Sequence, residues 1–383
     1  MQNVDPQAMK QIEDALKWLV RRRPIVQAVI AVERGDRSFC WTGAHGVAES
    51  GAPASPDTPF FIASIDKLLN ATIALMLHEA GRLDLDAPIQ IWLPGELVRG
   101  IHRRGDRDYS DQISVRHLLT HTSGLPDWLE ERPRSGASVI ESILEAGDRP
   151  FSLAEIADRV RMLTPHFPPA GASDDAVRAR YSDTNYVLLA AIIEAVAGAP
   201  LHEVHEEMLY RPLGMRHTWF PGHSAPLEPA PAALTLRADG VPLHVPRLIA
   251  SFNGIYSTAA DLLAFLRALV GGEIYRHAET LALQQGGWLR FGFPRDRAAL
   301  RAPGWPIQYG MGMMRFQLPR VFTPLASIPA VVGHTGSTGC WLFYCPDRDL
   351  FLAGAVDEVS AGAAPFRFVP RVLHLLRGMD HTR

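Results

Sequence analysis

The chain has few cysteines, and they are not spaced for a zinc site. Cys40, Cys340 and Cys345 form an odd set without a C-x-x-C pair or zinc-ligand spacing. This usage argues against a disulfide-stapled scaffold and a zinc finger, and it fits a reducing compartment. We expect three small buried side chains. A reactive thiol at Cys340 is the alternative, because this residue lies near a candidate active-site strand.

Long apolar runs and a large net charge are also absent. No uninterrupted apolar stretch reaches the roughly 18 residues that span a bilayer, and the nearest, 186–201, contains Glu194 and Gly198. The formal net charge is −3, which gives no electrostatic reason to expect nucleic acid. Glu13 and Asp14 lie where a signal peptide would be apolar. We therefore expect a cytoplasmic protein with no membrane and no nucleic-acid partner, and the oligomeric state is left open.

Lysine is scarce, and this scarcity singles out one position. Lys10, Lys17 and Lys67 are the only lysines, and the other 35 of the 38 basic residues are arginine. Lys67 follows Ser64 by three residues, so one helical turn brings a possible nucleophile and a possible proton acceptor to the same face. Residues 68–77 are apolar almost all round, which is typical of a buried helix. A buried lysine loses its proton readily, whereas arginine does not, so Lys67 suits proton transfer.

The order of the periodic segments indicates an α+β fold. Predicted strands lie near both ends of the chain, at 24–32, 38–46, 309–313, 331–334, 340–344 and 350–356. Predicted helices cover 6–20, 64–81, 115–119, 153–163, 186–197, 202–209, 258–269 and 365–376. This order predicts an antiparallel sheet built from both termini and flanked by helices, with an all-helical region inserted. We expect a sheet domain from residues 1–75 and 245–383, a mainly helical domain from 76–244, and an active site at their interface.

Two further segments carry residues suited to acyl transfer. Tyr181-Ser182-Asp183 precedes an apolar helix, and His334-Thr335-Gly336 lies on a predicted strand. With Ser64-x-x-Lys67, in this order, they resemble the three motifs of the serine β-lactamase and penicillin-binding-protein superfamily. The similarity is to its class C-like branch, which includes family VIII esterases, D,D-carboxypeptidases and D-aminopeptidases. It runs over nearly the whole chain, and further similar segments are Ile113–Pro126, Pro212–Met215 and Asn253–Leu262.

The resemblance implies a β-lactamase/transpeptidase-like fold and a set of roles. Ser64 is implied as the acylated nucleophile, and Lys67 and Tyr181 are implied as its proton-handling partners. The resemblance leaves open which of these two is the main base. His334 is implied as a neighbour on the sheet-edge strand, and the backbone N–H groups of Ser64 and Ser337 as the oxyanion hole. The chemistry is consistent, because a serine hydroxyl needs an adjacent base and a helix N-terminus favours developing negative charge. No metal or other cofactor is implied.

Two positions depart from the usual pattern of this superfamily and bear on the substrate. His334 stands in place of the lysine of the K-T-G motif, so an imidazole that is mostly uncharged at neutral pH replaces a fixed cation. We expect the adjacent Thr335 and Gly336 to contact the substrate. Asp183 stands where asparagine is common, and if it faces Lys67 it favours the ammonium form and repels anionic substrates. Both departures argue against efficient β-lactam hydrolysis, although carboxypeptidases with histidine in this motif bind anionic peptides.

Three aromatic residues are candidates for an apolar substrate pocket. Trp305 and Tyr309 precede the third-motif strand, and Trp128 follows the Ile113–Pro126 segment. Packing in the core is the alternative for each of them. His202 and His205 lie three residues apart without a third ligand, so we expect them on a helix surface and not at a metal site.

The sequence therefore predicts a metal-free serine hydrolase that cleaves a small carboxylic ester through an acyl-enzyme on Ser64. One alternative is a D-amino-acid amidase or aminopeptidase, in which Asp183 binds the substrate ammonium group. A D,D-carboxypeptidase, an acyltransferase using the same acyl-enzyme and a weak β-lactamase are further alternatives. A non-catalytic peptide-binding module is disfavoured, because Ser64, Lys67 and Tyr181 occur together.

Overall fold

The computed structural model describes residues 6–21, 24–49, 51–172, 177–292, 303–323 and 327–377. Eight strands of these residues form one sheet: β1 (Ala28–Arg34), β2 (Cys40–His45), β9 (Leu289–Arg290), β10 (Gln308–Tyr309), β11 (Met314–Phe316), β12 (Val331–Thr335), β13 (Cys340–Cys345) and β14 (Leu350–Val356). Their order is β2-β1-β14-β13-β12-β11-β10-β9, and every neighbouring pair is antiparallel. N-terminal β1 pairs with C-terminal β14 over its whole length. The prediction of an antiparallel sheet assembled from both termini is therefore confirmed.

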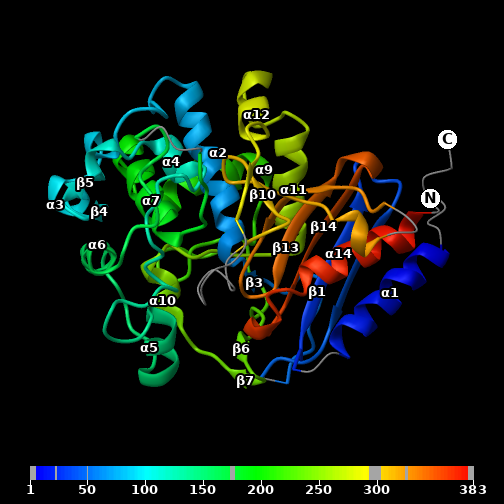
Figure 1. The fold of residues 1–383 in the computed structure, drawn as a ribbon. Helices are drawn as coiled ribbons and strands as arrows, with labels where there is room; N and C mark the ends of the chain where they lie inside the picture. Colours follow the sequence, from blue (N-terminus) through cyan, green and yellow to red (C-terminus); the bar gives the residue numbers. More distant parts are fainter. Residues whose placement is uncertain are drawn as a thin grey trace.

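Helices cover both faces of this sheet. α1 (Pro6–Val20) and α14 (Pro365–Leu375) pack against each other on one face, where they lie side by side (Figure 1). α11 (Ala259–Val270) packs against β1, β13 and β14. In β1, Ala28 and Ile30 join the core beneath α1, whereas Val29 and Ala31 join the core that includes α11. A strand covered on both faces buries side chains that point both ways, so β14 is apolar and buried over its whole length.

One predicted strand is wrong, because it is the turn of a hairpin. Residues 309–313 were expected to form a strand, but β10 ends at Tyr309 and β11 begins at Met314. The Gly310 N–H donates to the carbonyl of Met313, and Gly312 has a φ of 71° that favours glycine. A turn thus replaces the expected strand centre, and the strands β9 and β11 beside it were not predicted.

The other helices of the described residues gather beside the sheet (Figure 1). They are α2 (Asp66–Glu79), α3 (Gly95–Val98), α4 (Val115–Leu119), α5 (Val139–Ala146), α6 (Leu153–Met162), α7 (Asp183–Ala197), α8 (Leu201–His205), α9 (Arg211–Leu213), α10 (Pro246–Ser251) and α12 (Ala278–Gln284). Reciprocal serine caps at Ser114, Ser138 and Ser152 begin α4, α5 and α6. The predicted helices are found within a few residues of their expected bounds. The division at residues 75/76 and 244/245 stays a prediction.

Three short strand pairs complete the secondary structure. They are β3 (Phe60–Phe61) with β8 (Tyr256–Ser257), β4 (Arg103–Arg104) with β5 (Arg107–Asp108), and β6 (Arg237–Ala238) with β7 (Val241–Pro242). The first pair ties the segment before Ser64 to the segment before α11. This pair therefore anchors the chain just ahead of the candidate nucleophile.

No single helix among the described residues is both long and apolar enough to cross a bilayer. α7 and the helical segment Leu201–Leu213 meet the criteria of length and composition only together, and the pair is bent by 77°. The apolar character of α7 reflects packing, since Leu189, Ile192 and Ile193 lie in the core.

The three cysteines are unpaired but do not share one environment. Cys340 and Cys345 are buried as expected, whereas Cys40 is exposed, because it begins an edge strand of the sheet. The prediction of a buried side chain is therefore wrong for Cys40. The Cys340 thiol donates to the carbonyl of Ile62 at 3.0 Å, and burial raises its pKa to about 12. Cys340 is therefore a protonated thiol at neutral pH, which argues against the reactive alternative.

The expectation of a surface position is wrong for His205. Its side chain is fully buried, with Nε2 2.9 Å from Oδ1 of Asn70 and Nδ1 3.2 Å from the hydroxyl of Tyr210. In a neutral imidazole one nitrogen donates and the other accepts, so both contacts are satisfied without a charge. Burial accordingly lowers the pKa of His205 from 6.5 to about 3.

We expect the pH dependence of unfolding to report this buried imidazole. The folded state lowers the pKa of His205, so its stabilisation is complete above pH 6.5 and decreases as the pH falls from 6.5 toward 3. Between pH 7 and pH 5 the loss is roughly 2 kcal/mol. Urea unfolding at both pH values should show a decrease in the free energy of unfolding that is larger in the wild type than in His205→Gln by about this amount. Equal decreases in the two proteins would contradict the prediction.

Candidate active site

Ser64 lies where a strand gives way to a helix. After β3, the Ile62 N–H donates to the carbonyl of Ile255 at 3.0 Å. Ala63 then adopts a φ of 43°, which non-glycine residues rarely take, and a 3-10 turn, Ala63–Ile65, leads into α2. The sequence predicted a helix from Ser64 but not this strained residue ahead of it. The sharp reversal brings Ser64 to the start of the buried helix.

The end of β12 packs closely against this turn. A side chain on Gly336 would place its Cβ 2.7 Å from the Cβ of Ala63 and 2.9 Å from the carbonyl oxygen of Ile62. Only glycine fits so close an approach. The next residue, Ser337, is exposed, and its backbone N–H donates no hydrogen bond within the part of the chain that the structure describes. That N–H is therefore free to bind an oxygen.

Lys67 is at the centre of the cluster and is 5% exposed. Its Nζ donates to Oγ of Ser64 at 3.0 Å and lies 2.7 Å from Oδ1 of Asp183. Oδ1 of Asp66 is farther away, at 3.7 Å. The predictions that Lys67 is buried and shares a face with Ser64 are confirmed, and Asp183, whose orientation was left open, does face Lys67.

The neighbouring groups keep Lys67 charged. Burial alone lowers the pKa of a lysine, but the attraction of the nearby carboxylates, Asp183 before Asp66, outweighs it and raises the pKa of Lys67 well above its ordinary value. Burial also raises the pKa of Asp66 to about 6, against the attraction of Lys67. At neutral pH Lys67 is an ammonium ion, and Asp183 is its nearest counter-charge.

Tyr181 lies beside the same ammonium group. Nζ of Lys67 is 5.4 Å from the centre of the Tyr181 ring. Among the described residues, the buried Tyr181 hydroxyl makes no hydrogen bond. Burial raises the pKa of this hydroxyl, although Lys67 opposes the shift. Tyr181 is therefore a neutral phenol at neutral pH.

His121 lies at the back of the cluster, and sequence reasoning did not assign it a role. Its ring lies 4.4 Å from that of Tyr181 and 4.7 Å from that of Tyr309. Nδ1 accepts from the Ser182 N–H at 3.2 Å and from Nδ2 of Asn185 at 2.9 Å, so the proton belongs on Nε2. Burial, followed by Lys67, lowers the pKa of His121 well below its ordinary value. The one signal in the sequence was its place inside the similar segment Ile113–Pro126.

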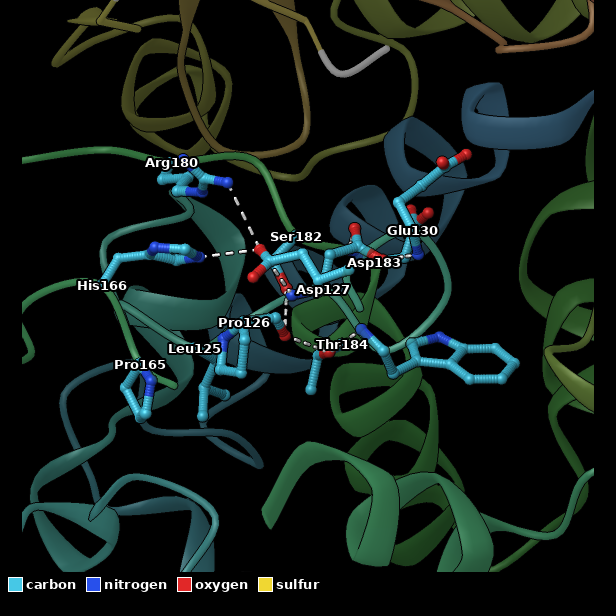
Figure 2. Close-up of polar contacts among 12 residues, drawn as sticks. Leu125, Pro126, Asp127, Glu130, Pro165, His166, Arg180, Ser182, Asp183 and Thr184 are labelled. Atoms are coloured by element: carbon cyan, nitrogen blue, oxygen red, sulfur yellow. Dashed lines mark hydrogen bonds and ion pairs between the residues drawn. The ribbon is translucent and has the colours of Figure 1, made fainter. Parts of the chain in front are cut away.

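Asp183 is held by the loop that contains Asp127. Figure 2 shows the two aspartates close together, with the Asp183 N–H donating to Oδ2 of Asp127 at 2.8 Å. Ser182 and Thr184 both donate their hydroxyls to the carbonyl of Pro126, at 3.0 and 2.6 Å. Burial and the proximity of Asp183 raise the pKa of Asp127 well above its usual range. These bonds fix the first turn of α7 and hence the position of the Asp183 carboxylate.

His334 is buried and uncharged. Its Nδ1 donates to the Thr335 carbonyl at 2.7 Å, so Nε2 accepts from the Tyr309 hydroxyl at 3.1 Å. Burial, assisted by Lys67, lowers the pKa of His334 to about 3. The expectation of a mostly neutral third motif at neutral pH is therefore supported by the structure. The hydroxyl of Thr335 turns toward Sδ of Met314 at 3.7 Å.

The aromatic pocket predicted from the sequence is not assembled at Ser64. Trp128 and Tyr309 are fully buried, so the prediction that they contact substrate is wrong. Trp128 packs edge-on against Phe151, and Tyr309 supports His334 from behind. Trp305 is exposed, but it lines a separate surface hollow of about 450 Å³ with Arg290, Pro306, Ile307, Gln308, Arg315, Gln317 and Pro319.

The described residues hold no group of three or more histidine, cysteine, aspartate or glutamate side chains arranged to bind a metal ion. The polar groups around Ser64 are one ammonium ion, carboxyl groups, a phenol and neutral imidazoles. This set suits proton transfer to and from a serine hydroxyl.

A serine beside a buried lysine, at the start of a helix next to a sheet built from both termini, is the arrangement of a serine hydrolase with the β-lactamase fold. A family model described as Beta-lactamase matches residues 12–363. Esterase EstB of Burkholderia gladioli is 30% identical over 329 residues, which cover 76% of this chain and 76% of the esterase. The chain belongs to the beta-lactamase family, as the sequence motifs predicted, and it is a serine hydrolase.

Solved structures agree with this assignment. A D-stereospecific amidohydrolase from Streptomyces sp. has a TM-score of 0.72 at 26% identity, with 96% of this chain and 97% of that chain covered. D-amino acid amidase from Ochrobactrum anthropi has a TM-score of 0.73 at 22% identity, with 97% and 98% covered, and shares the fold. The predicted β-lactamase/transpeptidase-like fold is confirmed.

Proposed function

We propose that the protein hydrolyses small carboxylic esters through an acyl-enzyme on Ser64. Oγ of Ser64 attacks the ester carbonyl, and the cluster of Lys67 and Tyr181 handles the proton. The N–H groups of Ser64 and Ser337 bind the oxyanion, as the close packing of Gly336 on Ala63 supports. Collapse of the tetrahedral intermediate releases the alcohol, and water then cleaves the acyl-enzyme.

The distribution of charge around Ser64 favours an uncharged ester over an anionic substrate. Lys67 is paired with Asp183 at 2.7 Å, and His334 is buried and neutral. The cluster therefore offers no uncompensated cation to an anionic substrate among the groups described around Ser64. An unscreened pair of unit charges at 4 Å is worth about 1–4 kcal/mol at effective dielectrics of 80 to 20. An uncharged ester does not need this interaction, whereas the carboxylate of a β-lactam does.

We expect short-chain p-nitrophenyl esters to be better substrates than a chromogenic cephalosporin. At pH 7.5 the ratio of the two kcat/KM values should be at least about tenfold, the factor that 1.4 kcal/mol represents. Steady-state hydrolysis of both compounds by one enzyme preparation measures this ratio of kcat/KM values. Equal or faster cephalosporin hydrolysis would show that other groups hold the carboxylate, and it would favour a β-lactamase.

An amidase acting on D-amino acid amides is the second candidate. The Asp183 side chain keeps 22% of its surface exposed beside Lys67, so it can meet a substrate ammonium group as well. The similarity to the D-stereospecific amidohydrolase favours this candidate. A panel of D- and L-amino acid amides, compared with their uncharged N-acetyl derivatives, separates it from the esterase. An amidase of this kind should prefer the free amines, and the esterase should not.

A further inference from the structure

The two groups that the proposed function uses for proton handling both hold their protons at neutral pH. Lys67 is an ammonium ion beside Asp183, and Tyr181 is a buried phenol. Acylation nevertheless requires the Ser64 hydroxyl to lose its proton as Oγ attacks. The buried imidazoles of His121 and His334 are weak acceptors, because burial lowers their pKa values. The cluster therefore needs an acceptor that is ionised at rest.

Two carboxylates among the described residues pair with Lys67, but only that of Asp183 lies within hydrogen-bond distance of Nζ. Oδ1 of Asp183 lies 2.7 Å from Nζ, is buried, and accepts no hydrogen bond from any other described residue. Asp66 lies at 3.7 Å, beyond hydrogen-bond distance. Asp127 is occupied by backbone N–H groups of Leu129, Glu130 and Asp183. Of the three carboxyl groups, that of Asp183 is therefore best placed to accept a proton from Lys67.

We propose that Asp183 is the terminal proton acceptor of acylation and that Lys67 relays the proton to it from Ser64. A Lys67 N–H proton moves to Oδ1 of Asp183, and the freed nitrogen lone pair takes the proton of the Ser64 hydroxyl. The bond from Oγ to the carbonyl carbon forms, and the carbonyl π electrons become the oxyanion. On collapse, the bond to the leaving oxygen breaks, that oxygen takes a proton from Lys67, and Lys67 recovers one from Asp183. This inference rests on the proposed ester hydrolysis and deepens it.

The relay keeps the charges of the buried cluster favourable. Lys67 begins and ends each transfer as an ammonium ion, so the neutral amine exists only during the transfer itself. One negative charge moves from Asp183 to the oxyanion, where backbone N–H groups bind it. Asp183 is the first residue of α7, and negative charge is favoured at a helix N-terminus. Its carboxyl group lies against Lys67 before the substrate arrives.

The test is the pH dependence of kcat/KM for an uncharged p-nitrophenyl ester in Asp183→Asn. The acidic limb of this profile reports protonation of the group that accepts the proton during acylation. In the variant the Lys67 amine itself must accept the proton, so the limb should move up by at least about 2 pH units, and kcat/KM at pH 6.5 should fall about 100-fold. The other titratable groups near Lys67 are Asp66 on α2, Tyr181, Tyr186 on α7, His121 and His334, and Asp127 lies beside Asp183; all of them remain unchanged.

Two variants serve as matched controls. Asp183→Glu keeps a carboxylate, so its acidic limb should stay near that of the wild type. Asp66→Asn removes the carboxylate whose ion pair with Lys67 is longer, at 3.7 Å and beyond hydrogen-bond distance, so its limb should stay nearer to that of the wild type than the limb of Asp183→Asn. An unshifted limb in Asp183→Asn, or an equal shift in Asp66→Asn, overturns the proposal. So does a loss in Asp183→Asn confined to amine-bearing substrates, which would make Asp183 a substrate contact only.

Labelling with a fluorophosphonate distinguishes a failure of the relay from a failure of the proposed acyl-enzyme. If wild-type Ser64 is not labelled, the proposed acyl-enzyme fails, and the relay fails with it. If wild-type Ser64 is labelled and Asp183→Asn shows the unshifted limb, only the relay fails. Labelling of Asp183→Asn at alkaline pH also shows that the variant is folded, because the serine then reacts through the Lys67 amine.

Discussion

Ser64→Ala is expected to lose essentially all turnover and all covalent labelling while it keeps the fold. The side chain accepts one hydrogen bond, from Lys67 at 3.0 Å, and alanine is smaller than serine and has a high helix propensity. Removal of the attacking oxygen leaves only the oxyanion hole and substrate binding. We expect kcat to fall by on the order of 10⁴-fold or more. Hydrolysis of p-nitrophenyl esters and intact-mass detection of the acyl-enzyme measure the two losses.

An exposed serine provides the control for this experiment. Ser135 lies on the surface, so Ser135→Ala should keep wild-type turnover and labelling. Circular dichroism and the melting temperature should agree for the wild type and both variants. Strong residual labelling of Ser64→Ala would place the nucleophile at another serine and would remove the basis of the proposed acyl-enzyme.

Much of this site was predictable because its motifs are local in sequence. Ser64 and Lys67 are one helical turn apart, so their contact follows from helix geometry alone. The scarcity of lysine then pointed to position 67. The family resemblance joined Tyr181 and Asp183 to this pair, and the structure places Asp183 against Lys67. The small-molecule substrate and the cytoplasmic location stay predictions from the sequence.

The errors concern residues whose environment depends on tertiary packing. Trp128 follows a family segment and looked like a pocket wall, but its ring fills the core beside Phe151. Tyr309 precedes Gly310 and Gly312, which form a turn in place of the predicted strand centre. A backbone φ of 56° and hydrogen bonds from Ser182 and Asn185 position the His121 ring in the cluster. These two residues lie about 60 positions away in the chain. No spacing within the sequence encodes such contacts.

Lys67→Arg is expected to stop acylation nearly as completely as Lys67→Ala. Arginine keeps the positive charge beside Asp183, but a guanidinium group does not give up its proton in proteins. It can neither act as a base nor serve as a relay between Ser64 and Asp183. We expect kcat/KM to fall by about 10³-fold, within the range that general acid–base catalysis contributes. Stopped-flow detection of the first turnover with a p-nitrophenyl ester measures acylation directly.

The pair of variants separates charge from proton transfer. The melting temperature of both variants must be measured as a control for folding, because Lys67 is 5% exposed. In Lys67→Arg the larger guanidinium group must fit between Ser64 and Asp183. If Lys67→Arg folds and keeps most of its activity, Lys67 is only an electrostatic fixture and the Tyr181 hydroxyl becomes the sole base. If Lys67→Arg is inactive and Lys67→Ala regains activity with added alkylamine, a small amine in the cavity replaces the missing group. That recovery requires a group that exchanges protons, since a fixed charge alone would already be present in the arginine variant.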